Sequence, residues 1–223
     1  MKIISHRGLW KEKKDKNSLL SFKESIDSGY GFEIDIRSFE NELIVSHDPL
    51  KRSDLQISNA KNPKTYFIEV LTYYKLQKSN VTLAINIKED GLASILSPLL
   101  HEYEVSNYFV FDMSIPDTIA YKNEEINFFS RQSEYEMTVS LYKNSSGVWL
   151  DEFNLHWITS EILEGHLREG KKVCIVSPDL HKRDYTEEWE HYKNFKDNIN
   201  DNNLIMLCTD KVIEAEGFFN SKI

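Results

Sequence analysis

The sequence predicts an α/β protein, a compact (β/α)₈ TIM barrel formed by a single domain that covers residues 1–223. Eight short apolar runs recur along the chain, and stretches with apolar residues three to four apart follow nearly all of them. Hydrophobic residues make up 40% of the chain, which is enough for one sizeable core. An open doubly wound sheet has the same local pattern, but no glycine-rich phosphate loop follows any run.

Each predicted strand is an apolar run of the length typical of a buried parallel strand. These runs cover residues 3–6, 31–36, 81–88, 108–114, 127–132, 147–153, 171–177 and 203–210. The predicted helices cover residues 18–28, 65–76, 91–104, 116–123, 133–143, 159–169, 186–195 and 211–219. The first helix shows the expected punctuation, because Asn17 and Ser18 offer an N-cap and Gly29 a stop. Residues 42–47 are predicted as an additional extended segment.

The charge balance excludes some classes of partner. The chain has 27 Lys and Arg against 36 Asp and Glu, a formal net charge of −9, and it lacks a basic patch interleaved with aromatic residues. Nucleic acid is therefore not an expected partner. No apolar run is long enough for a signal peptide or a membrane span, so we expect a cytoplasmic protein without stable membrane insertion. Cys174 and Cys208 lie in apolar runs, and we expect both to be buried and reduced, with no zinc site.

Polar residues stand at the carboxyl end of nearly every predicted strand, where functional groups gather in a (β/α)₈ barrel. An ionised group that faces a core is costly unless it is paired or bound to a metal, so repeated charges at these positions require a shared polar site. The residues concerned are His6, Arg7, Glu33, Asp35, Asn86, Lys88, Asp112, Arg131, Asp151, Glu152, Thr209 and Asp210.

The pair Glu33 and Asp35 is the sharpest of these features. The two-residue period of a strand puts both carboxylates on one side, about 6 to 7 Å apart. A hard divalent cation such as Mg²⁺ or Ca²⁺ relieves their repulsion and keeps open positions for a substrate phosphate. By the same two-residue period, the side chains of Asn86 and Lys88 lie on one side of their strand. Asn86 offers a neutral oxygen to the metal, and Lys88 offers a cation to an anionic ligand. An isolated pair of this kind is more often solvent-facing, but the apolar residues that flank it favour the site.

Two histidines, His6 and His47, each end an extended segment. A histidine pair suits acid–base work near neutral pH, because one takes a proton from the attacking oxygen while the other gives one to the leaving oxygen. Each could instead only cap a strand or turn, but the company of Glu33 and Asp35 favours catalysis. The histidines expected to be structural are His101, His156, His166, His181 and His191.

The order of these motifs resembles a known family. The motifs are His6-Arg7-Gly8, Asn17-Ser18 opening a helix, Glu33-x-Asp35 and Val45-Ser46-His47-Asp48-Pro49, and together they resemble the glycerophosphodiester phosphodiesterases. Residues 83–88 are similar to the family motif in which a metal-binding glutamate precedes a lysine by two, and Thr209-Asp210 resembles its closing strand motif. The resemblance spreads over the whole chain, is most specific over residues 3–49, and implies a phospholipase-C-like (β/α)₈ barrel.

The resemblance implies a divalent metal site, for Mg²⁺ or Ca²⁺, at Glu33 and Asp35. The third ligand, Asn86, stands where the family usually has a glutamate, so the site has one negative charge fewer. It then binds metal more weakly or recruits Asp112 as a further ligand. The seventh run also departs from the family, since residues 176–179 read Val-Ser-Pro-Asp where many members have a tryptophan beside the substrate. Substrate choice is therefore left more open than reaction class.

The resemblance further implies that His6 and His47 are the acid–base pair and that Arg7 and Lys88 clamp the phosphate. The expected reaction is metal-dependent hydrolysis of a small-molecule phosphodiester, a glycerophosphodiester or a related polyol or sugar diester, to an alcohol and a phosphomonoester. The family favours attack by an internal hydroxyl through a cyclic phosphate. The residues expected to bind a polyhydroxylated head group, unless they only form salt bridges, are Asp112, Arg131, Glu134, Asp151 and Glu152, with Trp149 nearby.

Two other interpretations remain open. Asn86 permits a catalytically silent barrel that only binds a phosphorylated ligand. A lipid phosphodiester lyase that leaves a cyclic phosphate is the second, and the lack of a secretion signal and of an exposed apolar stretch argues against a membrane substrate.

Overall fold

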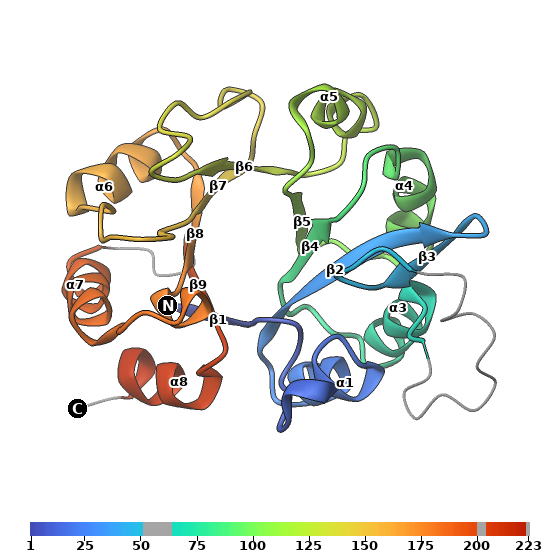
Figure 1. Cartoon of the computed structure of the whole chain (residues 1–223), viewed down its shortest axis with the longest axis horizontal. Helices are drawn as coiled ribbons and strands as arrows, with labels where there is room; N and C mark the ends of the chain where they lie inside the picture. Colours follow the sequence, from blue (N-terminus) through green and yellow to red (C-terminus); the bar gives the residue numbers. More distant parts are fainter. Residues whose placement is uncertain (51–63, 200–203, 222–223) are drawn as a thin grey trace.

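The computed structural model describes residues 1–50, 64–199 and 204–221, and within them nine strands form one sheet (Figure 1). Eight strands are parallel and follow one another in the order β5-β4-β2-β1-β9-β8-β7-β6, with β3 pairing antiparallel to β2. The strands are β1 (Lys2–Ser5), β2 (Gly31–Phe39), β3 (Glu42–Val45), β4 (Leu83–Ile87), β5 (Tyr108–Phe111), β6 (Phe129–Gln132), β7 (Gly147–Leu150), β8 (Lys172–Val176) and β9 (Ile205–Thr209). This confirms the predicted barrel.

Helices surround the strands on the outside of the barrel (Figure 1). In the first of them the Ser18 hydroxyl accepts a hydrogen bond from the Ser21 backbone N–H at 3.1 Å, which confirms the predicted cap. Phe22 and Ile26 of this helix are buried against the sheet. The helices are α1 (Leu19–Asp27), α3 (Phe67–Leu76), α4 (Ala93–Glu102), α5 (Ile115–Asn123), α6 (Ser160–Arg168), α7 (Thr186–Asp197) and α8 (Val212–Asn220), with short 3₁₀ helices at Lys13–Asp15 and Pro178–His181.

Alternation along the strands divides the side chains between two layers. One parity faces the barrel interior, where the rings of Phe109 and Phe129 stack at a centroid distance of 3.8 Å and those of Phe111 and Trp149 at 3.9 Å. The other parity packs against the helices. Cys174 and Cys208 are free and buried in β8 and β9, as expected. The interior is thus filled by side chains, and only the strand ends remain for polar groups.

The barrel closes weakly between β5 and β6. A single parallel bridge links Val110 of β5 to Phe128, the residue before β6, and the Val110 N–H donates to the Asn127 carbonyl at 2.9 Å. In contrast, the register of β2 with β4 runs from Phe32 to Ile36 without a break. We call the β5–β6 junction the seam, and it adjoins a pocket that Asp112 and Arg131 help to line.

One predicted helix, over residues 133–143, is wrong. The chain there forms turns, because Ser133 and Glu136 exchange backbone hydrogen bonds and Leu141 has a φ of 52°. The Arg131 side chain also pairs with the Glu136 carboxylate, which fixes the turn beside β6. The apolar residues have helical spacing, but the contacts of the turn decide the conformation of this segment. The extended segment predicted at 42–47 is confirmed as β3.

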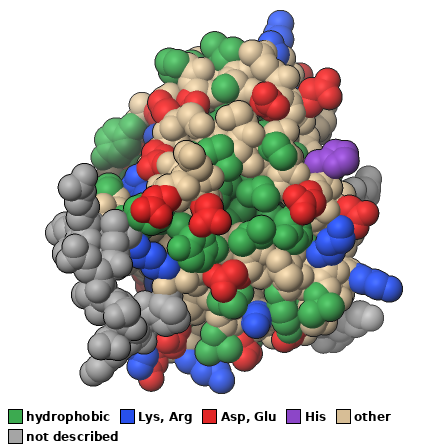
Figure 2. Space-filling model, turned by 90° about the vertical axis from the view of Figure 1, so that its right-hand side faces the viewer, with side chains coloured by type: hydrophobic (Ala, Val, Ile, Leu, Met, Phe, Trp, Pro, Cys, Tyr) green, Lys and Arg blue, Asp and Glu red, His purple; other side chains and the backbone are tan. Residues whose placement is uncertain are grey.

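The outer surface carries part of the acidic excess. Figure 2 shows the face on the side of α3 and α4, where hydrophobic side chains gather near the middle and Asp and Glu side chains border them. Within the described ranges, no helix has both the length and the apolar character that a membrane crossing requires.

Candidate active site

The carboxyl ends of the strands bring the predicted site residues together in the barrel mouth. Asp35, the central group, lies on β2 and is fully buried. Arg7 Nε is 3.0 Å from Asp35 Oδ2, and Lys88 Nζ is 3.2 Å from Oδ1. Asn17, which begins the α1 turn with a φ of 58°, donates its side-chain amide to Oδ2 at 2.7 Å. Burial alone would raise the pKa of Asp35, but Lys88, Arg7 and Asn17 hold it below its usual value.

Glu33 lies deeper in the barrel, two residues before Asp35 on the same side of β2, and only 2% of its surface is exposed. Its Oε2 accepts a hydrogen bond from the Arg7 backbone N–H at 3.1 Å. Burial, and then the Asp35 charge, raise the pKa of Glu33 well above its usual value. Two carboxylates in one dry site cannot both ionise without a compensating cation.

Asn86 supplies a third oxygen to the same place. It pairs with Asp35 in the register of β2 and β4, so the two side chains lie side by side on the inner face. Asn86 Oδ1 is buried and has no hydrogen-bond partner among the described residues. An orphaned buried carbonyl oxygen next to the carboxylates of Glu33 and Asp35 is a donor set that fits Mg²⁺ or Ca²⁺.

His6 follows β1 and is held by a carboxylate from the last strand. Its Nδ1 lies 2.8 Å from Asp210 Oδ1, and Lys16 Nζ lies 2.8 Å from Asp210 Oδ2. Asp210 is fixed in turn, because its backbone N–H donates to Asp179 Oδ2 at 3.0 Å. Burial lowers the pKa of His6, although the hydrogen bond to Asp210 acts in the opposite sense. With Nδ1 donating to Asp210, the neutral ring carries its lone pair on Nε2, as a general base requires.

His47 reaches the mouth from β3. The Ser46 N–H donates to the Asp35 carbonyl at 3.0 Å, which holds this segment beside β2, and Arg37 holds the His47 carbonyl at 3.0 Å. The His47 side chain is 46% exposed, and its Nδ1 is 2.8 Å from Asp48 Oδ1. The two histidines thus differ in environment, since His6 is largely enclosed and His47 is open to solvent.

The predicted head-group residues lie at the ends of β5, β6 and β7. Arg131 Nη1 is 3.3 Å from Asp112 Oδ1, so these two form an ion pair across the seam. Asp151 Oδ1 is 2.6 Å from Nε2 of His181, a histidine that the sequence analysis expected to be structural. Burial raises the pKa of Asp112, although the positive charge of Arg131 acts to lower it. Salt bridges, the alternative stated above, are therefore present, and they line the same mouth.

Comparison with solved structures places this geometry among known folds. A protein from Galdieria sulphuraria assigned as a glycerophosphodiester phosphodiesterase matches with a TM-score of 0.76 at 18% identity, covering 99% of this chain and 98% of that one. A phosphodiesterase from Oleispira antarctica in complex with the product sn-glycerol-3-phosphate matches at 0.70 and 13%, covering 99% and 97%. A glycerophosphoryl diester phosphodiesterase from Parabacteroides distasonis matches at 0.69 and 14%, covering 97% and 85%. The chain has the glycerophosphodiester phosphodiesterase fold. No family model and no curated protein sequence matches.

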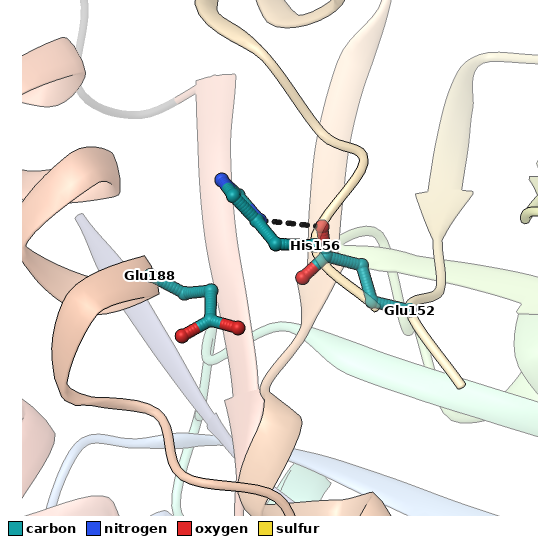
Figure 3. Close-up of side chains that lie close together, drawn as sticks. All are labelled: Glu152, His156 and Glu188. Atoms are coloured by element: carbon teal, nitrogen blue, oxygen red, sulfur yellow. Dashed lines mark hydrogen bonds and ion pairs between the residues drawn. The ribbon is translucent and has the colours of Figure 1, made fainter. Parts of the chain in front are cut away.

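A second group of possible metal ligands lies outside this mouth. Glu152, His156 and Glu188 offer ligand atoms within 4.8 Å of one another, from the end of β7 and from α7 (Figure 3). Glu152 follows Asp151, so strand alternation turns its side chain away from the mouth toward the helix layer. Arg183 already compensates the group, because its Nη2 is 2.6 Å from Glu188 Oε1.

The acceptor capacity of Glu152 is also used. Oε1 accepts from His156 Nδ1 and from the backbone N–H groups of Trp157 and Ile158, while Oε2 accepts from the Tyr192 hydroxyl at 2.8 Å. A metal there would have to displace these donors. The cluster therefore ties the chain after β7 to α7, and in this glycerophosphodiester phosphodiesterase fold the mouth is the better fitting cation site.

Sequence reasoning missed two contributors to the mouth. Lys16 is not among the residues that the sequence singled out, yet it binds Asp210 and lies over the Trp10 ring at 4.6 Å. His181 lies far from the other site residues in sequence, and only the Pro178–His181 turn brings it to Asp151. One feature of the sequence could have pointed to Lys16: it directly precedes Asn17, and Asn17 belongs to the family motif.

Proposed function

We propose that this protein hydrolyses small-molecule phosphodiesters, of glycerol or a related polyol or sugar, to an alcohol and a phosphomonoester, with a divalent cation. The observation that carries the proposal is the arrangement of Arg7, Asp35 and Lys88 around the unpartnered oxygen of Asn86 in the mouth. This arrangement combines oxygen ligands for a cation with two basic side chains for a phosphate. The shared fold and the product bound by the Oleispira antarctica enzyme support the same chemistry.

The metal would be held by Glu33, Asp35 and Asn86. A bound divalent cation supplies electrostatic stabilisation to the phosphoryl oxygens. With Asp35 bound to the cation, Arg7 and Lys88 would no longer be needed as its partners and would hold the substrate phosphate. Because Asn86 contributes no charge, we expect Mg²⁺ or Ca²⁺ to bind less tightly than at a site with three carboxylates.

The two histidines perform the proton transfers. One deprotonates the attacking oxygen, either an internal hydroxyl of the substrate or a water, and the other protonates the departing alcohol. Asp210 orients His6 through the Nδ1 hydrogen bond, which keeps Nε2 as the reacting atom. Asp112, Arg131 and Asp151 supply hydrogen-bonding groups to the head group at the rim.

Turnover of glycerophosphodiesters by the purified protein tests the proposal. We expect alcohol release with Mg²⁺ or Ca²⁺ that chelator abolishes, and loss of turnover in His6→Ala and His47→Ala while the fold is retained. His101→Ala on the surface of α4 is the matched control and should keep full activity. Persistent metal-dependent turnover in the His6→Ala/His47→Ala double variant would contradict the proposed roles.

Metal titration locates the cation independently of activity. Calorimetric binding of Mg²⁺ or Ca²⁺ should be lost in Asp35→Asn and unchanged in Glu188→Gln. The reverse result would move the metal site to the Glu152, His156 and Glu188 cluster.

A catalytically silent phosphate-binding barrel is the second candidate, and the neutral Asn86 ligand favours it. In that case glycerol phosphate binds in chelator, no diester is cleaved with any metal, and Lys88→Met abolishes binding. Phosphorus NMR of the products separates the hydrolase from a lyase, since a lyase leaves the cyclic phosphate as the final product.

A further inference from the structure

A third histidine faces the mouth, on the side opposite the proposed cation site. Asp151 continues β7 and points inward, because Trp149, two residues earlier, belongs to the core of the barrel interior. In the ring of parallel strands β7 lies opposite β2, since β1, β9 and β8 lie between them on one side and β4, β5 and β6 on the other. His181 follows β8 in the Pro178–His181 turn, and its Nε2 is 2.6 Å from Asp151 Oδ1. The pair therefore faces Asp35 across the mouth.

The turn that carries His181 is fixed by bonds that do not involve the His181 side chain. Asp179 Oδ1 accepts a hydrogen bond from the Thr209 hydroxyl at 2.7 Å, and Oδ2 accepts one from the Asp210 N–H at 3.0 Å. Backbone hydrogen bonds close the turn itself. The contact between His181 and Asp151 is thus an addition to an already anchored segment, and it remains available for a ligand.

Each member of the pair keeps one polar atom for a ligand. In the part of the chain that the structure describes, His181 Nδ1 and Asp151 Oδ2 take part in no hydrogen bond. The Asp151 side chain is 10% exposed and that of His181 is 22% exposed, so both are partly shielded from water. With Nε2 donating to Asp151, a neutral ring carries its lone pair on Nδ1. The pair then presents two hydrogen-bond acceptors to the mouth.

The two sides of the mouth differ in charge. Arg7 and Lys88 supply positive charge beside β2, where the proposed function places the phosphate. On the opposite side the Asp151 carboxylate is paired with an imidazole, while Arg131 on the neighbouring strand pairs with Asp112. An anionic head group would be repelled there, whereas groups that donate hydrogen bonds would be stabilised.

Hydroxyl groups fit the pair better than an ammonium group does. A hydroxyl can donate to Asp151 Oδ2 or to a neutral His181 ring, and it can also accept from the ring when Nδ1 is protonated. An ammonium group only donates, and a protonated imidazole beside it would repel it. Two neighbouring hydroxyls, as in glycerol or a sugar, can engage both atoms at once.

We propose that His181 and Asp151 form a recognition pair for two hydroxyl groups of the leaving alcohol, so that the preferred diesters carry a vicinal diol as head group. The inference rests on the proposed function and names its specificity-determining residue, His181. The phosphate lies at Arg7 and Lys88, and the head group crosses the mouth to the pair. A head group without these hydroxyls leaves both polar atoms without partners, which lowers the specificity constant.

Diesters of sn-glycerol 3-phosphate that differ only in the second alcohol test this inference. We expect kcat/KM for a glycerol head group to exceed that for a propanol head group about 10- to 100-fold, and to exceed that for ethanolamine as well. His181→Ala should lower the glycerol-to-propanol ratio about tenfold. His181→Gln should restore part of it, because an amide can donate to Asp151 and accept from a hydroxyl.

His156→Ala is the matched control. His156 forms the same kind of pair with Glu152, at 2.8 Å, but on the helix side of the strand end (Figure 3). Its substitution should leave the glycerol-to-propanol ratio unchanged. Because each ratio is measured within one variant, a difference in the amount of folded protein cancels.

Equal kcat/KM for the glycerol and propanol diesters overturns the inference and leaves the proposed function intact. So does a higher kcat/KM for the ethanolamine diester, a preference that survives in His181→Ala, or a ratio that falls equally in His156→Ala. Absence of turnover with every diester contradicts the proposed function instead. Calorimetry with sn-glycerol 3-phosphate and propyl phosphate then decides the inference. Tighter binding of glycerol phosphate that His181→Ala removes supports the pair, whereas equal affinities or a preference that survives in His181→Ala exclude it.

Discussion

Asp35→Asn should destabilise the metal-free protein strongly, although it removes no volume. The carboxylate is fully buried, whereas the Arg7 and Lys88 side chains that pair with it are 23% and 18% exposed. Coulomb's law at an effective dielectric constant of about 20 gives about 5 kcal/mol for each pair, before the cost of desolvating the three charges. The asparagine variant keeps that cost for both cations and loses their partner. The expected net loss is about 3 to 5 kcal/mol, or about 6 to 20 °C in Tm.

Urea unfolding and thermal melting in the presence of chelator measure this loss. Asp197→Asn is the matched control, because Asp197 pairs with Lys196 at 2.9 Å but is 52% exposed. We expect it to change the free energy of unfolding by less than about 1 kcal/mol. The pH dependence gives a second check. Because the pKa of Asp35 is lowered in the folded protein, its contribution to stability is present at neutral pH and is lost as the pH falls below about 3.8 toward the pKa of the folded state. Equal stability of Asp35→Asn and wild type would refute the buried ion-pair network.

Three further predictions concern the mouth and the barrel wall. Burial and the Asp35 charge raise the pKa of Glu33 above 4.5, so metal-free protein loses stability as pH rises from there, and Glu33→Gln should be more stable than wild type at pH 8 in chelator, measured by urea unfolding. Asp210→Asn should lower kcat about 10²- to 10⁴-fold by misorienting His6, with a melting curve near that of wild type; unchanged kcat would remove the positioning role. In Gly147→Ala the new Cβ would lie 2.5 Å from a ring on β6 and cost about 1 to 3 kcal/mol, whereas Gly165→Ala, with open space on α6, should gain about 0.5 to 1 kcal/mol; equal unfolding midpoints would contradict this.

Strand parity explains why much of the mouth could be predicted. Glu33, Asp35, Asn86 and Lys88 follow a two-residue period within apolar runs, and the fold places them on one inner face as expected. The same parity distinguishes Asp151, which faces the mouth, from its neighbour Glu152, although the sequence analysis grouped both at one strand end.

Contacts distant in sequence could not be predicted. Lys16 binds Asp210 across 194 positions, and charge pattern alone gave it no partner. Residues 133–143 have the apolar spacing of a helix, but the pairing of Arg131 with Glu136 is a side-chain contact that favours a turn. Local propensity is a weak guide where tertiary contacts decide the conformation.

The seam gives the barrel two unequal sides. β1 and β9, the first and last strands, pair over four positions from Lys2 to Ser5, while β5 and β6 on the other side share one bridge. A hinge at β1–β9 and an opening at β5–β6 is therefore the motion that breaks the fewest backbone hydrogen bonds. Asp112 and Arg131 lie on opposite sides of that junction, so their ion pair helps to hold it closed. Separation of that ion pair would therefore loosen the barrel wall at the junction with the fewest backbone hydrogen bonds.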